Sequence, residues 1–472
     1  MKKISIVLLK QDLRISDNPA FARAIEANHD ILPIYVYDKC NFNIGSSSKI
    51  WLHKSLENLN KNLDDKLNLY FNRPEEVILS LVKIYDVVNI FCNACYEPWY
   101  IESSASVKNL CIQNSINYEE FNGNYLWGPD IIKKDDGGYY KVFSQYKKKA
   151  HCLPYRTKVN YDKPKNIIKD ISNQTKLLDL NLLPVNKWYD KIEKFWEIGE
   201  SFAQEKLDFF LENHLIGYKE NRNFPYKNSV SRLSPHLHFG EISPSQIFEK
   251  ISQYSNAHHS NQHSNENNED IEHFKSEILW REFSSYLLFH FKNLDKENFN
   301  AKFDKFPWKY DLDLLTKWQK GNTGYPLIDA GMRELWQTGY MHNRVRMVTA
   351  SFLVKNLNIH WKYGMNWFWN CLVDADLANN SASWQWVAGS GADAAPYFRI
   401  FNPILQSEKF DSDGEYIKKF IPELKNMPIK YLHTPWLAPE NILNTSGIID
   451  YPKPIIDFLS SRNPALERYN NL

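Results

Sequence analysis

Side chains that could do chemistry are concentrated in the segment 374–403, near the C-terminal end of the chain. The segment contains two carboxylates, two adjacent amides and a Trp-Gln-Trp triplet, namely Asp374, Asp376, Asn379, Asn380 and residues 384–386. Carboxylates and carboxamides beside paired indoles suit a planar ligand with apolar faces and hydrogen-bonding edges. On composition alone, a helical core in which the tryptophans only fill space is an equally good interpretation.

A second polar group lies at Ser229–Ser234, with the sequence SVSRLS. Its hydroxyls and backbone N–H groups accompany Arg232 in a loop that leads into a helical pattern. Such a loop suits a pyrophosphate group. The alternative is an ordinary helix N-cap, which needs no ligand.

Length and composition bound the possible classes of protein. The chain has 472 residues, enough for two or three domains with cores of their own. Its aromatic share of 15% indicates either a dense helical core or a stacking site for a flat ligand. Because the formal net charge is only +1, no field of the whole molecule attracts nucleic acid, and DNA binding would require a local patch.

The six cysteines are scattered and do not form a disulfide framework, which fits a reducing compartment. Cys92 and Cys95 form a C-x-x-C sequence, which we interpret as a buried thiol pair rather than a metal or redox site. Only Cys371 lies in the C-terminal half, so a four-cysteine iron–sulfur cluster there is not expected. No segment approaches the roughly 18 apolar residues of a membrane helix, and a cytoplasmic monomer is expected.

Four apolar runs near the N-terminus predict buried strands of a parallel sheet, at 4–9, 31–37, 67–71 and 87–92. Helical periods lie between them, at 19–28, 47–65 and 74–85. This alternation predicts a Rossmann-like α/β domain over residues 1–125. The first strand is not followed by G-x-G-x-x-G, which argues against a dinucleotide site of that type.

The rest of the chain is predicted to be a linker at 126–200 followed by an all-helical domain at 201–472. Helices are predicted at 201–213, 271–292, 311–320, 325–338, 342–356 and 364–372. Lys147–Lys149 in the linker is interpreted as a solvated run. The polar segment Asn256–Asp270 is interpreted as a disordered surface insertion, although its His258, His259 and His263 could bind a metal.

Four segments of the second half resemble the photolyase/cryptochrome family: Glu277–Phe283 (EILWREF), Thr323–Arg333 (TGYPLIDAGMR), Tyr340–Lys355 (YMHNRVRMVTASFLVK) and 374–403. The likeness runs from about Lys3 to about Tyr451 and is strongest at 233–410. It implies a bacterial class I-like photolyase that uses reduced FAD and light to repair cyclobutane pyrimidine dimers in damaged DNA. The family's first domain carries a folate or deazaflavin antenna. Its folate-type Asn-Glu pair is missing from Asn93–Glu102, so the identity of the antenna is left open.

The resemblance also implies which residues hold FAD. The phosphates and neighbouring groups correspond to Tyr218, Val230, Ser231, Arg232, Leu233, Ser234 and Phe274. Arg346 and Asp374 correspond to an ion pair beside the flavin ring, and Asp376 to a nearby hydrogen-bonding group. Asn380 corresponds to the residue that faces flavin N5, where an amide is a poor proton donor and favours the reduced anionic form.

The resemblance also implies which residues transfer electrons and which bind the substrate. Trp384, Trp361 and Trp308 correspond to the family's tryptophan chain from flavin to surface. Trp280 and Trp386 would form two apolar walls around a flipped-out dimer. The resemblance implies polar and soft dimer contacts from Glu277, Asn343 and Met347, with Glu277 stabilising the dimer radical anion, and phosphate contacts from Arg222, Arg344 and Arg399. For each of these arginines alone, an intramolecular ion pair is nearly as good an interpretation.

Two other functions remain open at this stage. A cryptochrome would sense light without repair, and members of that kind often lose substrate-pocket residues, all of which are present here. A plain flavin or nucleotide-binding module would leave the tryptophan chain and the dimer pocket unexplained. A DASH-type cryptochrome is expected to have W-Q-Y where this chain has W-Q-W.

Overall fold

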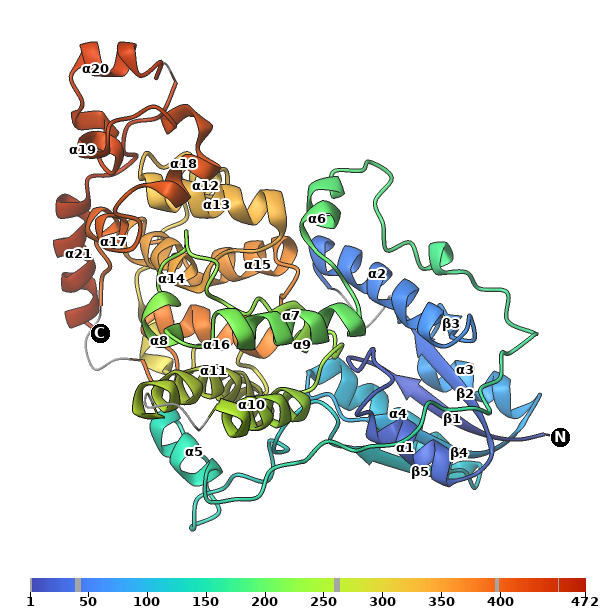
Figure 1. The fold of residues 1–472 in the computed structure, drawn as a ribbon. Coiled ribbons are helices and arrows are strands. Elements are labelled where there is room, and N and C mark those ends of the chain that lie inside the picture. Colours follow the sequence, from blue (N-terminus) through green and yellow to red (C-terminus); the bar gives the residue numbers. More distant parts are fainter. Residues whose placement is uncertain (1, 39–43, 259–263, 395–398, 449) are drawn as a thin grey trace. The chain divides into compact units, whose positions relative to one another are not determined.

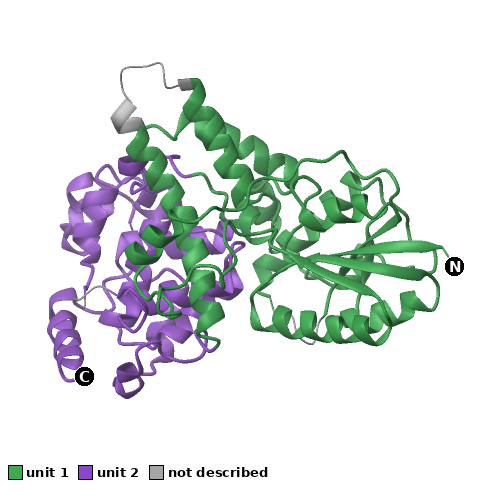
Figure 2. Ribbon diagram, turned by 90° about the horizontal axis from the view of Figure 1, so that it is seen from below, with its two compact units in different colours: residues 1–216, 231–292 green, residues 217–230, 293–472 purple. Residues whose placement is uncertain are grey.

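The computed structural model describes residues 2–38, 44–258, 264–394, 399–448 and 450–472. The chain forms two compact units (Figure 2). Unit 1 comprises residues 1–216 and 231–292, and unit 2 comprises residues 217–230 and 293–472. His259 and His263, named above as possible metal ligands, lie outside the described residues.

Unit 1 contains the predicted parallel sheet, with strand order β3-β2-β1-β4-β5 (Figure 1). The strands are β1 (Lys3–Leu9), β2 (Asp30–Val36), β3 (Asn68–Tyr70), β4 (Asp86–Asn93) and β5 (Asn117–Phe121). All pairings are parallel, as the alternation with helices predicts. The intervening helices are α1 (Pro19–Glu26), α2 (Ser46–Asn62), α3 (Pro74–Val82) and α4 (Pro98–Gln113).

Strand β5 was not predicted from the sequence, because it lies at the edge of the sheet. Its residues, NYEEF, include no fully buried side chain, whereas β1 is buried from Ile4 to Leu9. A central parallel strand is covered on both faces and is apolar throughout. The edge strand β5 pairs only with β4 and shows no such run.

Residues 126–200 are not structureless, as a simple linker would be. They contain α5 (Phe143–Ala150), the 3₁₀ turn Leu177–Leu180 and α6 (Asp190–Phe195), joined by irregular segments. The Lys147–Lys149 run lies on α5, whose Phe143 and Tyr146 are buried. An apolar face on so short a helix is hard to detect from sequence.

The remaining helices of unit 1 are α7 (Glu200–Asn213), α9 (Ser234–His238), α10 (Pro244–His258) and α11 (Ser264–His290). The polar segment Asn256–Asp270 was expected to be disordered, yet 256–258 ends α10 and 264–270 begins α11. The expectation is wrong for these residues, because polar turns can extend a helix whose adjoining part is fixed by tertiary packing.

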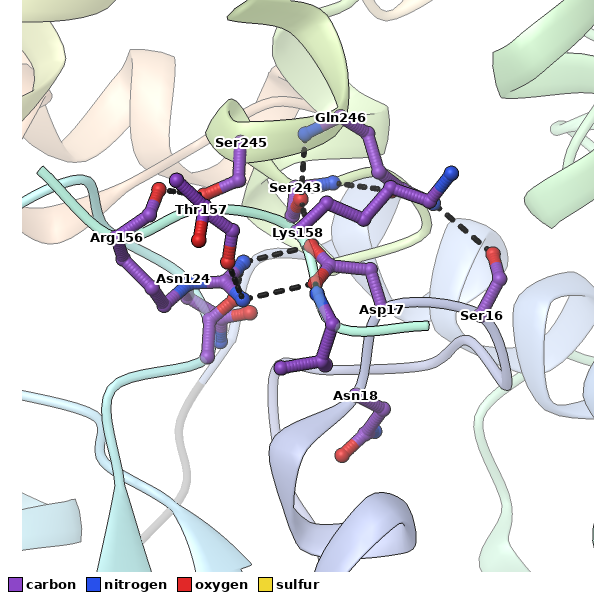
Figure 3. Close-up of polar contacts among 12 residues, drawn as sticks. Ser16, Asp17, Asn18, Asn124, Arg156, Thr157, Lys158, Ser243, Ser245 and Gln246 are labelled. Atoms are coloured by element: carbon purple, nitrogen blue, oxygen red, sulfur yellow. Dashed lines mark hydrogen bonds and ion pairs between the residues drawn. The ribbon is translucent and has the colours of Figure 1, made fainter. Parts of the chain in front are cut away.

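Asp17 ties three separate segments of unit 1 together (Figure 3). Its carboxylate accepts two hydrogen bonds from Arg156, at 2.8 and 2.6 Å, and one from the backbone N–H of Val159 at 2.8 Å. Ser243, just before α10, also donates to it. These hydrogen bonds and the Arg156 charge outweigh the effect of burial and lower the pKa of Asp17. The loop after β1, the irregular segment 156–159 and the start of α10 are therefore fixed at one buried charge.

Unit 2 is helical, as predicted. Its main helices are α8 (Tyr218–Asn221), α12 (Leu312–Gln319), α13 (Pro326–Thr338), α14 (Asn343–Ser351), α15 (Trp361–Cys371) and α16 (Leu377–Ala388). They are followed by α17 (Pro403–Phe410), α18 (Glu415–Phe420), α19 (Ile429–Leu432), α20 (Glu440–Thr445) and α21 (Phe458–Asn470). The predicted helix 342–356 continues beyond α14 as a π-helical turn at Phe352–Asn356.

The TGYPLID sequence forms a local clamp at the start of α13. The buried Asp329 carboxylate accepts hydrogen bonds from the backbone N–H groups of Thr323 and Gly324, and from the hydroxyls of Thr323 and Tyr451. This motif is structural and supports the helices that carry the candidate site. No helix in the described part of the chain is both long and apolar enough to cross a membrane.

Candidate functional site

Arg346 on α14 and Asp374, between α15 and α16, form a largely buried ion pair in unit 2. The Arg346 Nη2 atom lies 2.9 Å from Asp374 Oδ2 and 3.1 Å from Oδ1. The Nε atom donates to the backbone oxygen of Met341 at 2.7 Å, and the guanidinium lies over the Tyr340 ring. Burial lowers the pKa of Arg346, but the Asp374 charge outweighs it and the net shift is upward. The predicted ion pair is therefore present, and the Arg346 guanidinium is held in one orientation.

Asn379 and Asn380 are positioned by the first turn of α16. Asp376 caps the helix by accepting from the backbone N–H and the side-chain Nδ2 of Asn379, both at 2.8 Å. Asn380 donates its Nδ2 to the backbone oxygen of Met365 on α15 at 3.0 Å. This hydrogen bond fixes the orientation of the amide, whose Oδ1 atom is its acceptor. An acceptor of this kind matches a protonated ring nitrogen.

Trp384 is buried between α15 and α16. Its ring centroid lies 5.0 Å from that of Phe368 in an edge-to-face arrangement and 6.2 Å from that of Trp318. The α-carbon of Gly364 lies against the same indole, since a β-carbon there would fall 2.1 Å from Cη2 of Trp384. The position of the first tryptophan of the predicted chain is therefore fixed by the backbone of α15.

The imidazole ring of His360 contacts both Trp361 and Trp308. The ring of His360 lies 5.4 Å from Trp361 and 5.1 Å from Trp308, measured between centroids. Trp361 is fully buried and donates its Nε1 hydrogen to Asn298 at 2.9 Å, whereas Trp308 is half-buried. Burial and the nearby Lys362 lower the pKa of His360 to about 4, so the imidazole between the two indoles is neutral near pH 7.

Gln385, the middle residue of the Trp-Gln-Trp triplet, has a role that the sequence analysis missed. It is fully buried, donates to the backbone oxygens of Leu294 and Glu297, and accepts from the backbone N–H of Phe299 at 2.7 Å. It therefore fixes the segment that carries Asn298, the partner of Trp361. In the sequence, the signal for this role is an amide residue placed between two tryptophans.

The arginines predicted to contact phosphate groups influence one another in unit 2. Arg344 on α14 donates to the Oδ1 atom of Asn223 at 2.5 Å and lies over the Phe410 ring at 4.5 Å. It forms no ion pair with a carboxylate among the described residues. Burial, together with the charges of Arg222 and Arg399, lowers its pKa. A cation with neutral partners and like-charged neighbours is a suitable site for an anion.

Three of the predicted dimer contacts, Asn343, Met347 and Trp386, lie in unit 2 with these arginines. On α14, Asn343 is exposed and Met347 is half-buried, with its sulfur 3.9 Å from Arg344 Nη1. Trp386 is half-buried, and its Nε1 hydrogen is donated to the backbone oxygen of Asp393 at 3.1 Å. Arg399 is exposed.

Glu277 and Trp280 lie on α11 in unit 1. Both are half-buried and, three positions apart, share one side of the helix. The Trp280 ring stacks on Phe143 of α5 with 3.7 Å between centroids. The sequence analysis did not predict this contact, because it gave residues 126–200 no packed helix.

The predicted phosphate loop is short and tightly turned. Arg232 has a left-handed backbone with φ of 51°, and the Ser231 hydroxyl accepts from the backbone N–H of Leu233. Ser234 begins α9, which has only five residues, so anion binding here depends on side chains and local N–H groups more than on a helix dipole. Val230 and Tyr218 belong to unit 2, where Arg222 lies over the buried Tyr218 ring. Phe274 is buried against Phe210, with 4.6 Å between ring centroids.

A separate cavity lies at the carboxyl ends of β1 and β2, the usual ligand position of a doubly wound sheet. Its lining includes Lys10, Tyr35, Asp38, Trp99 and Tyr100. Trp99 and Tyr100 belong to the segment 93–102, where the sequence analysis places part of the antenna site. The lining shows a suitable position for an aromatic ligand but does not identify one.

Known proteins and family models match nearly the whole chain. Residues 5–163 match the family model described as DNA photolyase, and residues 274–471 match the model described as the FAD binding domain of DNA photolyase. A deoxyribodipyrimidine photo-lyase from Agrobacterium fabrum is 40% identical over 98% of this chain and 97% of its own. The chain belongs to the DNA photolyase/cryptochrome family.

Other members of the photolyase/cryptochrome family include both photolyases and cryptochromes. The crystal structure of a bacterial class III photolyase from Agrobacterium tumefaciens has a TM-score of 0.94 at 39% identity, covering 100% of this chain and 98% of that one. Cryptochrome-2 of Arabidopsis thaliana is 34% identical over 98% of this chain and 78% of its own. The predicted fold class is confirmed, and the class I-like assignment stays a prediction.

FAD is the cofactor of this family domain, and the donor set of unit 2 fits it. The Arg346 guanidinium, the Asp374 and Asp376 carboxylates and the Asn380 amide supply a cation, anions and a neutral acceptor. A flavin ring edge combines imide and amine hydrogens with carbonyl oxygens, so it needs a mixture of this kind. The contacts of each predicted residue with FAD remain predictions.

Proposed function

We propose that this protein repairs cyclobutane pyrimidine dimers in DNA, using light and reduced FAD. Arg344 carries the proposal. It is a half-buried guanidinium with an amide and a thioether as polar partners, and Arg222 and Arg399 add repulsion. A light sensor that signals to another protein does not need such a cluster, whereas a DNA-repair enzyme uses it for the backbone phosphates.

When bound, FAD supplies the photoexcited electron that splits the cyclobutane ring, and the electron then returns with no net redox change. The chain supplies binding, orientation and electrostatics. Arg346 and Asp374 would hold the cofactor edge in one position, and the Oδ1 atom of Asn380 would be the hydrogen-bond acceptor there. Asn380 carries no acidic proton, so it favours the anionic reduced form that can donate an electron.

The remaining residues are proposed to act on the substrate or to restore the reduced cofactor. Trp280 and Trp386 are each proposed to stack on the flipped-out dimer, and Glu277 is proposed to hydrogen-bond a pyrimidine edge, where as a donor it stabilises developing negative charge. Trp384, Trp361 and Trp308 carry an electron inward to oxidised flavin. In this proposal, residues 1–125 form the antenna domain, 126–200 the linker and 201–472 the catalytic domain.

The test is repair of a duplex oligonucleotide that contains one thymine dimer. The purified, reduced protein is incubated with it under blue light and in the dark, and restored thymines are counted by chromatography. Light-dependent restoration is expected. No restoration by a protein that binds FAD and photoreduces it would overturn the proposal.

A cryptochrome function is the second candidate, and the 34% identity with a plant cryptochrome favours it. The same assay separates the two. A sensor would undergo the photochemistry of its flavin, leave the dimer intact and bind damaged and undamaged duplex equally well.

A further inference from the structure

The rings of Phe143 and Trp280 form a close stack in unit 1. The ring centroids lie 3.7 Å apart and the planes are inclined by 12°. Phe143 is buried, whereas Trp280 is half-buried. The phenyl ring therefore covers one face of the indole. This near face-to-face arrangement is not the intrinsic optimum of an aromatic pair, so it must be imposed by the surrounding structure.

Four further contacts hold α5 and the residues just before it against α11. Tyr146 packs on Phe283 and Tyr286, with centroid distances of 5.1 and 5.0 Å. Lys147 donates to the hydroxyl of Ser276 at 2.7 Å, directly before Glu277. Just before α5, the backbone N–H of Tyr140 donates to the Tyr286 hydroxyl at 2.8 Å. The helix is thus fixed at its start, along its length and near the residues predicted to meet the dimer.

We propose that Phe143 is a positioning residue for substrate recognition, which holds the plane of the Trp280 indole so that its other face can stack on a flipped pyrimidine dimer. This inference rests on the proposed function. It adds a residue from a segment that the sequence analysis interpreted as a surface linker. An indole that is fixed before DNA arrives loses little rotational freedom on stacking, so preorganisation contributes directly to affinity.

The effect acts on affinity for damage more than on the general attraction to DNA. Base–aromatic stacking depends on the orientation of both planes, whereas phosphate contacts of arginine and lysine do not depend on Trp280. Aromatic pairs contribute a factor of about two to ten to an equilibrium constant. Loss of the phenyl ring is therefore expected to weaken dimer binding by about that factor and to leave undamaged duplex binding unchanged.

The experiment uses the full-length FAD-loaded protein with the substitution Phe143→Leu, which keeps an apolar side chain but removes the ring. Tyr146→Leu is the matched control, because it removes a ring from the same interface without touching Trp280. Dissociation constants are measured in the dark for thymine-dimer duplex and for undamaged duplex. FAD content and thermal midpoint are recorded for each variant.

Phe143→Leu is expected to reduce the preference for dimer duplex about two- to tenfold at unchanged FAD content. Tyr146→Leu should lower the thermal midpoint similarly and keep the preference. Phe143→Tyr, which retains the ring, should behave like the wild type. If Phe143→Leu does not fold, Phe143→Met replaces it. Equal effects of Phe143→Leu and Tyr146→Leu on the preference would overturn the inference.

A double-mutant cycle with Trp280→Ala separates this inference from the proposed function. Phe143→Leu should have no further effect once Trp280 is absent, and a persisting effect would show that Phe143 does not act through the indole. If Trp280→Ala itself leaves the preference for damage intact, the pocket assignment in the proposed function fails. If only Phe143→Leu is without effect, the inference fails alone.

Discussion

Gly364 lies directly against the indole of Trp384. A β-carbon at position 364 would fall 2.1 Å from Cη2 and 2.4 Å from Cζ3 of that ring, with Leu353 at 2.7 Å on another side. Real side chains do not tolerate such distances, so only glycine permits this approach of α15 to the ring. The first tryptophan of the proposed electron-transfer chain is thereby placed by backbone packing.

Gly364→Ala should displace Trp384 and slow the photoreduction of oxidised flavin. Overpacking of this kind also costs about 1–3 kcal/mol of stability. Gly331→Ala is the control, because its β-carbon would fall 2.3 Å from Val345 and equally overpack the unit 2 core without touching Trp384. Both variants should lose stability in denaturant titrations, but only Gly364→Ala should lose photoreduction rate. Equal rates would contradict the role of this contact.

Trp361→Phe and Trp308→Phe should each slow photoreduction at least tenfold and leave repair by chemically reduced protein nearly intact. Phenylalanine preserves an aromatic ring but is much harder to oxidise than indole. His360, which contacts both indoles, is neutral near pH 7 and so adds no positive charge between Trp361 and Trp308. Trp188→Phe, at an exposed position of the segment 126–200, is the control. Flavin bleaching under blue light with an external thiol gives the rates.

Asn380→Asp should replace a neutral amide by a group that can deliver a proton. Illumination is then expected to accumulate a neutral flavin form in place of the anionic one, visible in the absorption spectrum. Asn379→Asp is the control, because the neighbouring Asn379 amide donates to Asp376. This variant should not accumulate the neutral flavin form. An unchanged spectrum in Asn380→Asp would show that this amide does not face the reactive ring nitrogen.

Arg344→Ala should weaken binding of both damaged and undamaged duplex, because a phosphate contact carries no sequence information. The slope of log affinity against log salt should fall by about one unit. Arg333→Ala serves as the control, since Arg333 is paired with Glu423 at 2.7 Å and is not assigned to DNA. Fluorescence anisotropy over a range of salt concentrations gives both quantities. Identical slopes for wild type and Arg344→Ala would remove Arg344 from the phosphate set.

Glu282 makes the stability of unit 1 depend on pH. Its carboxyl accepts from the backbone N–H groups of Leu126 and Trp127, and burial raises its pKa from 4.5 to about 7. The folded state therefore retains this proton between those values while the unfolded state releases it. Stability contributed by this residue is greatest below pH 4.5 and falls as the pH rises to about 7.

Glu282→Gln keeps a side-chain acceptor and cannot ionise. Relative to this variant, the wild type should lose up to about 3 kcal/mol of unfolding free energy as the pH rises from about 4.5 to 7. Denaturant midpoints of both proteins, measured at several pH values, test this difference. A constant difference across the range would contradict a raised pKa.

Much of the architecture could be predicted because its physical signals are local. Buried runs such as 4–9 and 87–92 identify central strands, and 3.6-residue periods identify α12, α13 and α15. Strand β5 and helix α5 were missed because neither has an extended apolar pattern, and their positions depend on distant partners. The candidate site was located by resemblance, whereas its support by Gln385, Gly364 and Phe143 depends on side-chain packing that spacing does not encode.

The Asp17 network has a consequence for exchanging modules between relatives. A chimera joined near residue 125 would take the loop of Asp17 from one parent, and Arg156 and Ser243 from the other. If the second parent lacks these partners, a buried carboxylate is left uncompensated, which typically costs about 3–5 kcal/mol. A viable graft would have to transfer residues 156–159 and 243–246 together with the sheet. Exchange of the sheet between relatives is therefore expected to succeed only when the partners of Asp17 are exchanged with it.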